Sequence, residues 1–127
     1  MLSVVYVSVA DPTIGEDDVA SIVDIARHNN ARSALTGALI YNGNNFLQLL
    51  EGPDDAVEAC LAAIRNDTRH SGMVEIRRRA IEKRDFAAWT MLYERDVGED
   101  FSHLAVKARL DPQDEKIMTN FFALGRR

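Results

Sequence analysis

An Asn-Gly pair in the middle of the chain is the feature that most limits the fold. Asn42-Gly43 lies between two apolar runs, Ser33 to Tyr41 and Asn45 to Leu50. The tight two-residue turns that suit hairpins need positive φ at both central residues, which Asn and Gly adopt most readily. The pair therefore predicts a β-hairpin, so two strands of the fold must be antiparallel neighbours.

The segment before this hairpin predicts a strand and then a helix. Leu2 to Val9 is rich in Val and is bounded by Asp11-Pro12, which is typical of a strand buried on both faces. From Val19 onward the apolar positions recur at the i, i+3, i+4, i+7 spacing of a one-faced helix. Because Asn is a common helix terminator, we expect this helix to end near Asn29-Asn30.

The segment after the hairpin predicts a second helix and two further strands. Pro53, Asp54 and Asp55 favour the first turn of a helix, whose apolar stripe is Val57, Cys60, Leu61 and Ile64. Met73 to Ile81 predicts a fourth strand and Trp89 to Tyr93 a short fifth one.

The remaining residues favour helix from Asp100 onward, with apolar positions at Phe101, Leu104, Ala105, Ile117, Met118, Phe121, Phe122 and Leu124. The predicted class is α+β, in the ferredoxin-like order β-α-β-β-α-β-β with a mixed sheet. Right-handed crossovers would place two helices on one face, and the C-terminal helices would then cover the other. We expect a core of residues 1–95 and a helical extension, residues 96–127, packed on the sheet.

Composition excludes several classes of protein. The net charge is −5, which argues against a nucleic-acid surface, and the three histidines, His28, His70 and His103, are too far apart to predict a metal site. The single cysteine, Cys60, suits a reducing cytosol. No apolar run approaches the roughly 20 residues that span a membrane, and the N-terminus has no signal-peptide pattern. We therefore expect a cytoplasmic protein.

Two polar residues interrupt apolar strands and require an explanation. A buried amide without partners costs about 1–3 kcal/mol, so Gln48 either faces solvent or has a specific partner. Tyr6 is compatible with a half-buried core tyrosine whose hydroxyl reaches the surface. The run Arg77-Arg78-Arg79 is typical of a solvated face, although it could also meet an acidic partner.

Six short segments, taken together and in order, resemble the BLUF family of blue-light sensors that bind FAD. They are Val5 to Ser8, Asn29 to Arg32, Leu35 to Tyr41, Phe46 to Gly52, Asp67 to Ser71 and Phe86 to Met91. The resemblance runs from about Met1 to Tyr93, which would make residues 1–95 the flavin-binding domain. The C-terminal segment resembles the tail of the short BLUF proteins that carry no effector domain.

The resemblance implies a set of FAD contacts. Ile22 and Ile64 would sandwich the flavin ring, and Asn30 would bond its pyrimidine edge, next to Asn29 where some relatives have His. The other implied contacts, near the FAD tail, are Asp67, Arg69 and His70. From the pattern alone, the two isoleucines are equally typical of core positions and Asn30 of a helix end.

The resemblance also implies the photochemistry. Tyr6 would give an electron and a proton to the excited flavin, and Gln48 would rotate or tautomerise before both return. An amide has a donor and an acceptor end, so it can bridge a tyrosine and a flavin in more than one pattern. The flavin would end chemically unchanged, with a red-shifted spectrum. Trp89 and Met91 would carry the change toward the surface, although core packing explains them as well.

The predicted function is therefore a photoreceptor with non-covalent FAD, and not an enzyme. It would signal through a downstream protein, which the sequence does not identify, or through another copy of itself in a homo-oligomer. One alternative is a small redox flavoenzyme, although the chain lacks a G-x-G-x-x-G loop. Another is a ligand-sensing or RNA-binding ferredoxin-like module, but RNA binding needs more basic charge than this chain has.

Overall fold

The computed structural model describes residues 1–88, 90–95 and 112–125. The elements follow one another as β1 (Leu2–Ala10), α1 (Glu16–Arg32), β2 (Thr36–Tyr41), β3 (Asn45–Gly52), α2 (Asp54–Arg65), β4 (His70–Ala80), β5 (Leu92–Arg95) and α4 (Pro112–Gly125). The order and the α+β class agree with the sequence prediction. Among the described helices, none is long and apolar enough to cross a lipid bilayer.

The five strands form one mixed sheet in the order β4-β1-β3-β2-β5. β1 is antiparallel to both β3 and β4, β2 is antiparallel to β3, and β5 pairs with β2 in the parallel direction. The predicted hairpin joins β2 to β3, but its turn differs from the prediction because only Gly43 takes a positive φ, of 98°. Asn42 acts instead through its side chain, whose Oδ1 accepts hydrogen bonds from the amides of Asn44 and Asn45.

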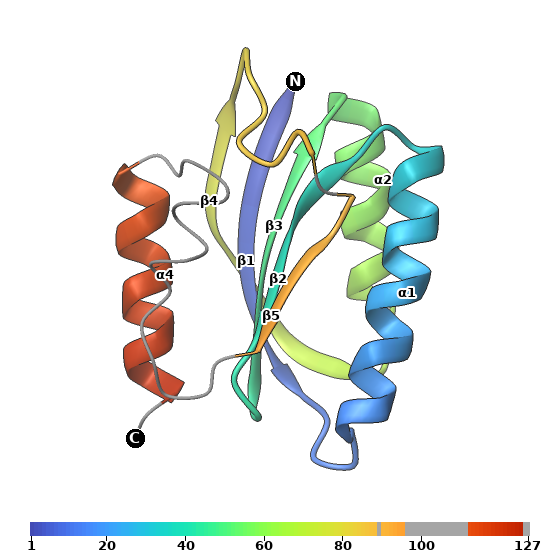
Figure 1. Cartoon of the computed structure of the whole chain (residues 1–127), viewed down its shortest axis with the longest axis vertical. Helices are drawn as coiled ribbons and strands as arrows, with labels where there is room; N and C mark the ends of the chain where they lie inside the picture. The colour runs from blue at the N-terminus through green and yellow to red at the C-terminus, as the bar shows by residue number, and fades with distance from the viewer. Residues whose placement is uncertain (89, 96–111, 126–127) are drawn as a thin grey trace.

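Two helices cover one face of the sheet and α4 lies on the other, as Figure 1 shows. Alternate strand residues point to opposite faces, so each strand supplies two cores. The core toward α1 and α2 includes Val4, Tyr6, Leu39, Tyr41, Phe46, Leu50, Val23, Val57 and Leu61. The core toward α4 contains Val5, Ala38, Ile40, Leu47, Leu49, Phe86, Leu92, Met118 and Phe121. The sheet is therefore buried on both faces, as its Val-rich and Leu-rich strands predict.

The arginine run of β4 is divided between the two faces, and only Arg78 of the three is exposed, as the pattern of a solvated face predicts. Arg77 is buried and forms an ion pair with Asp114 of α4, at 2.6 Å between Nε and Oδ1. Arg78 instead pairs with Glu58 of α2, at 2.7 Å. The acidic partner of this run therefore comes from the same chain, and it ties α4 to the sheet.

Several predicted boundaries were wrong. The first helix continues past Asn30 to Arg32, because it is the positive φ of Ala34, 57°, that breaks the helical path. The fourth strand begins earlier than predicted, at His70, where it pairs with Ala10. The fifth strand begins only at Leu92.

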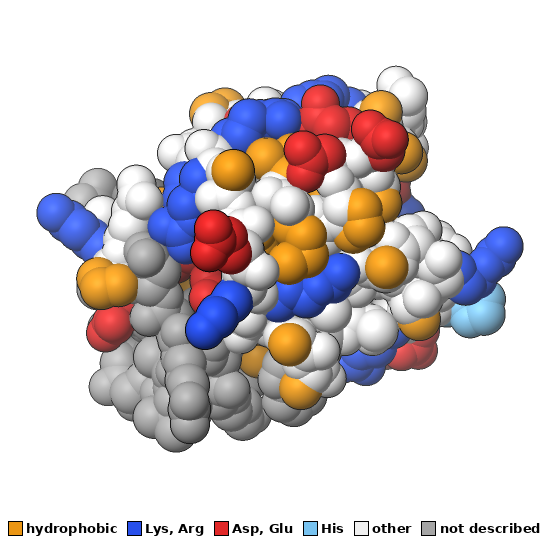
Figure 2. All heavy atoms as spheres, turned by 90° about the horizontal axis from the view of Figure 1, so that it is seen from above, with side chains coloured by type: hydrophobic (Ala, Val, Ile, Leu, Met, Phe, Trp, Pro, Cys, Tyr) orange, Lys and Arg blue, Asp and Glu red, His pale blue; other side chains and the backbone are white. Residues whose placement is uncertain are grey.

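Some predicted features lie outside the described residues. These are Trp89, the helical positions Phe101, Leu104 and Ala105, and the side chains of Phe122 and Leu124. On the face seen in Figure 2, acidic and basic side chains are mixed with apolar ones over the described part of the surface.

Candidate functional site

Tyr6 and Gln48 form a buried hydrogen-bonded pair at the centre of the sheet. They are directly opposite each other in the register of β1 and β3, and the Tyr6 hydroxyl donates to Gln48 Oε1. Their exposed fractions are 4% and 6%, so Gln48 does not face solvent. Burial, followed by the nearby Cys60 and Asp67, raises the pKa of Tyr6 well above its usual value. The phenol is therefore neutral and donates its proton.

The other end of the Gln48 amide reaches toward β5. Its Nε2 donates to the sulfur of Met91 at 3.8 Å, a weak hydrogen bond because a thioether is a poor acceptor. The carbonyl of Met91 in turn accepts a hydrogen bond from Arg27 Nε of α1 at 3.0 Å. Gln48 thus connects the tyrosine of β1 to the residue that immediately precedes β5.

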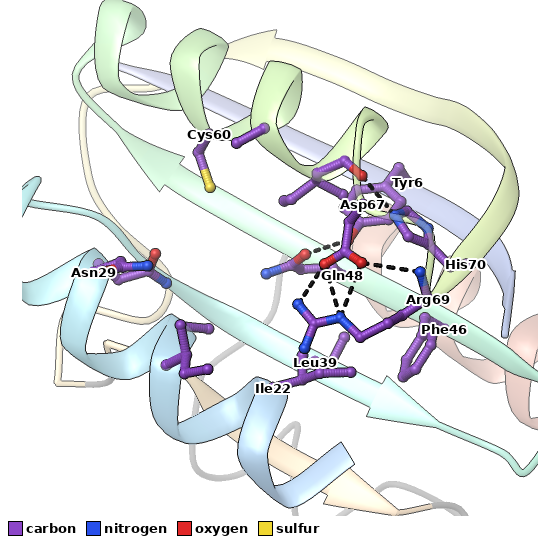
Figure 3. A pocket seen from close by; sticks show the side chains of 15 residues that line it. Tyr6, Ile22, Asn29, Leu39, Phe46, Gln48, Cys60, Asp67, Arg69 and His70 are labelled. Carbon is purple, nitrogen blue, oxygen red and sulfur yellow. Dashed lines mark hydrogen bonds and ion pairs between the residues drawn. The ribbon is translucent and has the colours of Figure 1, made fainter. Parts of the chain in front are cut away.

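A cavity of about 200 Å³ lies beside this pair, between α1 and α2 (Figure 3). Holding one water molecule takes roughly 10–15 Å³, so the cavity has room for a ligand. The strands contribute Tyr6, Leu39, Phe46 and Gln48, α1 contributes Ile22, Ile25, Ala26, Asn29 and Asn30, and α2 with the segment after it contributes Cys60, Ala63, Ile64, Asp67, Arg69 and His70.

Helical spacing places the lining side chains of α1 on one wall of the cavity and those of α2 on the opposite wall. Ile22, Ala26 and Asn29 follow one another at i, i+4 and i+7 on α1, and Cys60, Ile64 and Asp67 repeat that spacing from α2 into the loop after it. The walls are therefore apolar in their middle and polar toward the ends of the helices. A flat aromatic ring between two aliphatic walls fits this arrangement.

An ion pair and a histidine complete one end of the cavity. Arg69 donates from its backbone amide and from Nε to Asp67 Oδ1, both at 2.9 Å, and these bonds lower the pKa of that carboxyl below its usual value. His70 Nε2 donates to the carbonyl of Ile64 at 2.7 Å. The His70 Nδ1 is buried, and no hydrogen-bond partner for it is found in the described part of the chain. This nitrogen is an acceptor suited to a hydroxyl of a bound ligand.

Comparison with known families identifies the family of the chain. The model of the family described as sensors of blue light using FAD, BLUF, matches residues 1–92. The chain belongs to the BLUF family. Proteins of this family sense blue light with a bound flavin, which is the kind of flat, partly polar ligand that the cavity suits.

The sequence relatives of this BLUF chain include much longer proteins. Photoactivated adenylate cyclase subunit beta of Euglena longa is 34% identical over 92 residues, which are 72% of this chain and 11% of the cyclase subunit. The blue light- and temperature-regulated antirepressor BluF of Escherichia coli is 43% identical over 58 residues, 46% of this chain and 14% of the antirepressor. The chain thus spans only a small part of the curated relatives it matches.

Solved BLUF structures share the fold. The dark-state structure of BlrB, a BLUF protein, has a TM-score of 0.73 at 28% identity, over 91% of this chain and 82% of BlrB. A manganese and cyclic-diGMP complex of BlrP1 from Klebsiella pneumoniae has a TM-score of 0.86, also at 28% identity. That alignment covers 100% of this chain and 34% of BlrP1.

The BLUF structure brings together all nine residues that the sequence assigned to the cofactor. Each of them lines the cavity: Tyr6, Ile22, Asn29, Asn30, Gln48, Ile64, Asp67, Arg69 and His70. Met91 contacts Gln48, while Trp89 lies outside the described residues. The amide nitrogen of Asn30 donates to the carbonyl of Thr90 at 2.7 Å, so the amide oxygen is the atom that this side chain can offer to a flavin N–H.

Sequence reasoning did not assign six other lining residues: Ile25, Ala26, Leu39, Phe46, Cys60 and Ala63. Periodicity was the signal that could have found them. Leu39 is opposite Gln48 in the β2–β3 register, and Phe46 precedes Gln48 by two positions on the same strand face. Cys60 and Ala63 lie one turn before Ile64 and Asp67, respectively, on α2 and its extension.

Proposed function

We propose that this chain is a blue-light photoreceptor that binds FAD non-covalently and signals through another protein. The observation that carries the proposal is the continuous contact from Tyr6 through Gln48 to Met91 beside a ligand-sized cavity. This arrangement couples a group that an excited flavin can oxidise to the backbone at the start of β5. The preference for FAD over a shorter flavin rests on the description of the family.

Each group around the cavity has a proposed role. Ile22 and Ile64 hold the two faces of the ring, while Asn29 and Asn30 bond its polar edge from the end of α1. The segment after α2 receives the remainder of the cofactor, through Asp67, Arg69 and His70. In support, the buried Nδ1 of His70 lies where a ligand hydroxyl could satisfy it.

The mechanism depends on the Tyr6–Gln48 hydrogen bond. The bound flavin supplies the absorption of blue light and, once excited, a strong oxidant for the phenol. The raised pKa keeps Tyr6 protonated in the dark, so its hydroxyl would give up a proton together with the electron, and Gln48 Oε1 already accepts the hydrogen bond of that proton. Both would pass to the flavin and would later return to Tyr6. Gln48 then rotates or tautomerises. Rotation would turn Nε2 away from the Met91 sulfur and toward the Tyr6 oxygen, and the original state returns by the reverse path.

The wider assignments follow from this role. We propose a sensor domain of residues 1–95, with residues 96–127 as a helical extension that packs on the sheet, and no enzymatic activity on this chain. The family match to residues 1–92, which leaves out α4, supports the division. A cytoplasmic location, a downstream signalling protein and assembly into a homo-oligomer are part of the same proposal, with Trp89 acting beside Met91.

The test is an absorption spectrum before and after a blue flash, on protein purified with its flavin. We expect a reversible red shift in the native chain. Gln48→Leu and Tyr6→Phe should keep the flavin bound but lose the shift, since each removes one partner of the buried pair. Leu49→Met, at the neighbouring position on the opposite face, is the matched control and should keep it.

Two results would contradict the proposal. A normal red shift in Gln48→Leu would exclude Gln48 as the switch. Steady oxidation of NADH by the flavin-loaded chain in the dark would instead indicate the redox-enzyme alternative.

A further inference from the structure

The buried side of α4 is a polar–apolar stripe of four residues. Asp114, Ile117, Met118 and Phe121 follow the i, i+3, i+4, i+7 spacing, so they lie on one face of the helix. Asp114 and Met118 are fully buried and Phe121 is 5% exposed. The stripe therefore consists of one acid followed by apolar side chains over two turns.

Two arginines of β4 form ion pairs with Asp114. Arg77 approaches both oxygens of Asp114, with Nε at 2.6 Å from Oδ1 and Nη2 at 3.1 Å from Oδ2. Arg79 Nη2 lies 3.2 Å from the same Oδ2, and Arg77 also donates to the carbonyl and hydroxyl of Ser3. Buried ion pairs add little net stability but demand the correct partner. Contacts between units that separate are more polar than permanent ones.

The apolar residues of the stripe pack on the α4 face of the sheet, against residues that are sequence neighbours of Gln48 and Met91. Met118 and Phe121 share a cluster with Phe86, Leu92 and the outward residues of β2 and β3. Leu92 directly follows Met91, whose sulfur accepts the Gln48 hydrogen bond on the opposite side of the sheet. The surface under α4 is therefore one residue away from the proposed switch, through the sheet.

We propose that this surface, the α4 dock, is the output surface of the chain and that α4 occupies it as an internal ligand. The α4 dock consists of Arg77, Arg79, Leu47, Leu49, Phe86 and Leu92. Its external partner is a protein that presents an amphipathic helix, with Asp or Glu at one position and large apolar residues four and seven positions later. Light favours exchange by shifting Met91 and Leu92, a step that rests on the proposed function.

The chemistry of the α4 dock selects this partner. A helix without the acid would leave the buried Arg77 without the carboxylate of Asp114, which is strongly unfavourable, whereas the partly exposed Arg79 would keep its contact with Asp85. A nucleic acid could supply the negative charge, but it could not fill the apolar half between Leu47, Leu49 and Leu92. Rearranging one or two hydrogen bonds changes an equilibrium roughly ten- to a hundredfold, which is enough to favour exchange without unfolding the domain.

The test is binding of a fluorescent peptide of residues 112–125 to the flavin-loaded full chain, measured by anisotropy. Native chain in the dark should bind weakly because its own α4 competes, and illumination should strengthen binding about tenfold or more. A full chain carrying Asp114→Asn should bind the native peptide at least tenfold more tightly than the native chain does in the dark. A peptide carrying Asp114→Asn should lose this binding, whereas a peptide carrying Glu115→Gln, an exposed acid beside Asp114, should keep it.

The outcomes separate the α4 dock from the photochemistry, because the red shift is recorded on the same samples. A normal red shift without peptide binding in either light state or in the variant would overturn the α4 dock. Equal binding of the native and the Asp114→Asn peptides would also overturn it. Peptide binding to the variant in a chain without a red shift would support the α4 dock and contradict the photoreceptor function. If the variant does not fold, the illuminated native chain decides, and a doubled mass of native chain in the light would mean that copies exchange α4 instead.

Discussion

The two faces of the sheet are built from alternate residues of the same strands, yet they handle polar groups in opposite ways. Toward α1 and α2, Tyr6 and Gln48 share one good hydrogen bond, and within the described residues the nitrogen of the amide donates to the weak sulfur acceptor of Met91. Toward α4, Arg77 and Asp114 form a buried ion pair, in which Arg77 Nη2 donates a hydrogen bond to Oδ2 and Nε lies 2.6 Å from Oδ1. The first arrangement can be exchanged at small cost, whereas the second holds a particular partner.

The faces also differ in how they are filled. The α1/α2 face contains a cavity of about 200 Å³ over Gln48 and Leu39, whereas Leu47 and Ile40, on the adjoining positions, are fully buried against the α4 side. Consecutive residues of one strand therefore lie in different environments, one lining the cavity and the next buried in the packed core on the α4 side. The comparison indicates that the sheet leaves room for a small ligand on one face and packs against a helix on the other.

Removing α4 tests this division with the largest expected effect. Deleting residues 111–127 would strip Met118 and Phe121 from the packed face, at about 1.5–3 kcal/mol for each buried side chain. It would also remove the carboxylate that pairs with Arg77. These losses are comparable with the whole stability of a small domain. We expect aggregation or a large fall in Tm, measured by size exclusion and thermal unfolding. An unchanged Tm would mean that α4 serves a partner without supporting the fold.

Leucine-to-alanine substitutions, one on each face of the sheet, test whether the two faces differ in packing. Leu47→Ala should cost about 2–5 kcal/mol in urea unfolding of the flavin-free protein, because it opens a void in a filled core. Leu39→Ala, on the neighbouring strand, only widens an existing cavity and should cost clearly less. The difference should shrink when flavin is bound. Equal costs without flavin would show that the α1/α2 face is packed as tightly as the other.

The link between the faces is tested at Met91. Met91→Ala should keep the red shift, since Tyr6 and Gln48 remain paired, but it should weaken the light-dependent hydrogen-exchange differences in β5 and α4. Met73→Ala, also on the α1/α2 side, is the control and should leave those differences intact. Full exchange differences in Met91→Ala would place the route from one face to the other elsewhere.

The smallest effect concerns pH and the end of the cavity formed by Asp67 and Arg69. The hydrogen bonds from Arg69 lower the pKa of Asp67, so in the range near pH 4 the unfolded chain binds a proton that the folded chain does not. The stabilisation is complete above that range and is lost as pH falls through the lower folded pKa. Because Asp67 is partly exposed, the contribution is small. Asp67→Asn should flatten the acid limb of a Tm–pH curve slightly, whereas Glu82→Gln, an exposed control, should flatten it less.

The sequence supported those parts of the structure that local patterns encode. The hairpin at Asn42-Gly43 and the burial of β1 on both faces followed from local sequence patterns, although the turn itself differs from the prediction because Asn42 does not take a positive φ. The cavity residues followed from the family resemblance, since periodicity alone would have assigned Ile22 and Ile64 to an ordinary core. The assignment of roles within the cavity and the division at residue 95 stay predictions, as does the part played by Trp89.

Long-range polar contacts could not be predicted in this way. Arg77 and Asp114 are 37 positions apart, and Asn30 meets the carbonyl of Thr90 across 60 positions. Such contacts depend on how α4 and the segment before β5 lie against the sheet, which no local pattern encodes. The same holds for the true start of β5 at Leu92, because its pairing with Ala38 sets the strand boundary.

The adjacency of Met91 and Leu92 on opposite faces has a consequence for how such a protein can evolve. If the α4 dock recognises a partner helix, substitutions on the α4 side of the strands can alter which helix it binds without touching the residues proposed to set light absorption and recovery. Changes around Gln48 can likewise retune the lifetime of the signal while the recognition surface stays constant. Selection can therefore act on partner choice and on light response separately, although both traits are carried by neighbouring residues of one small sheet.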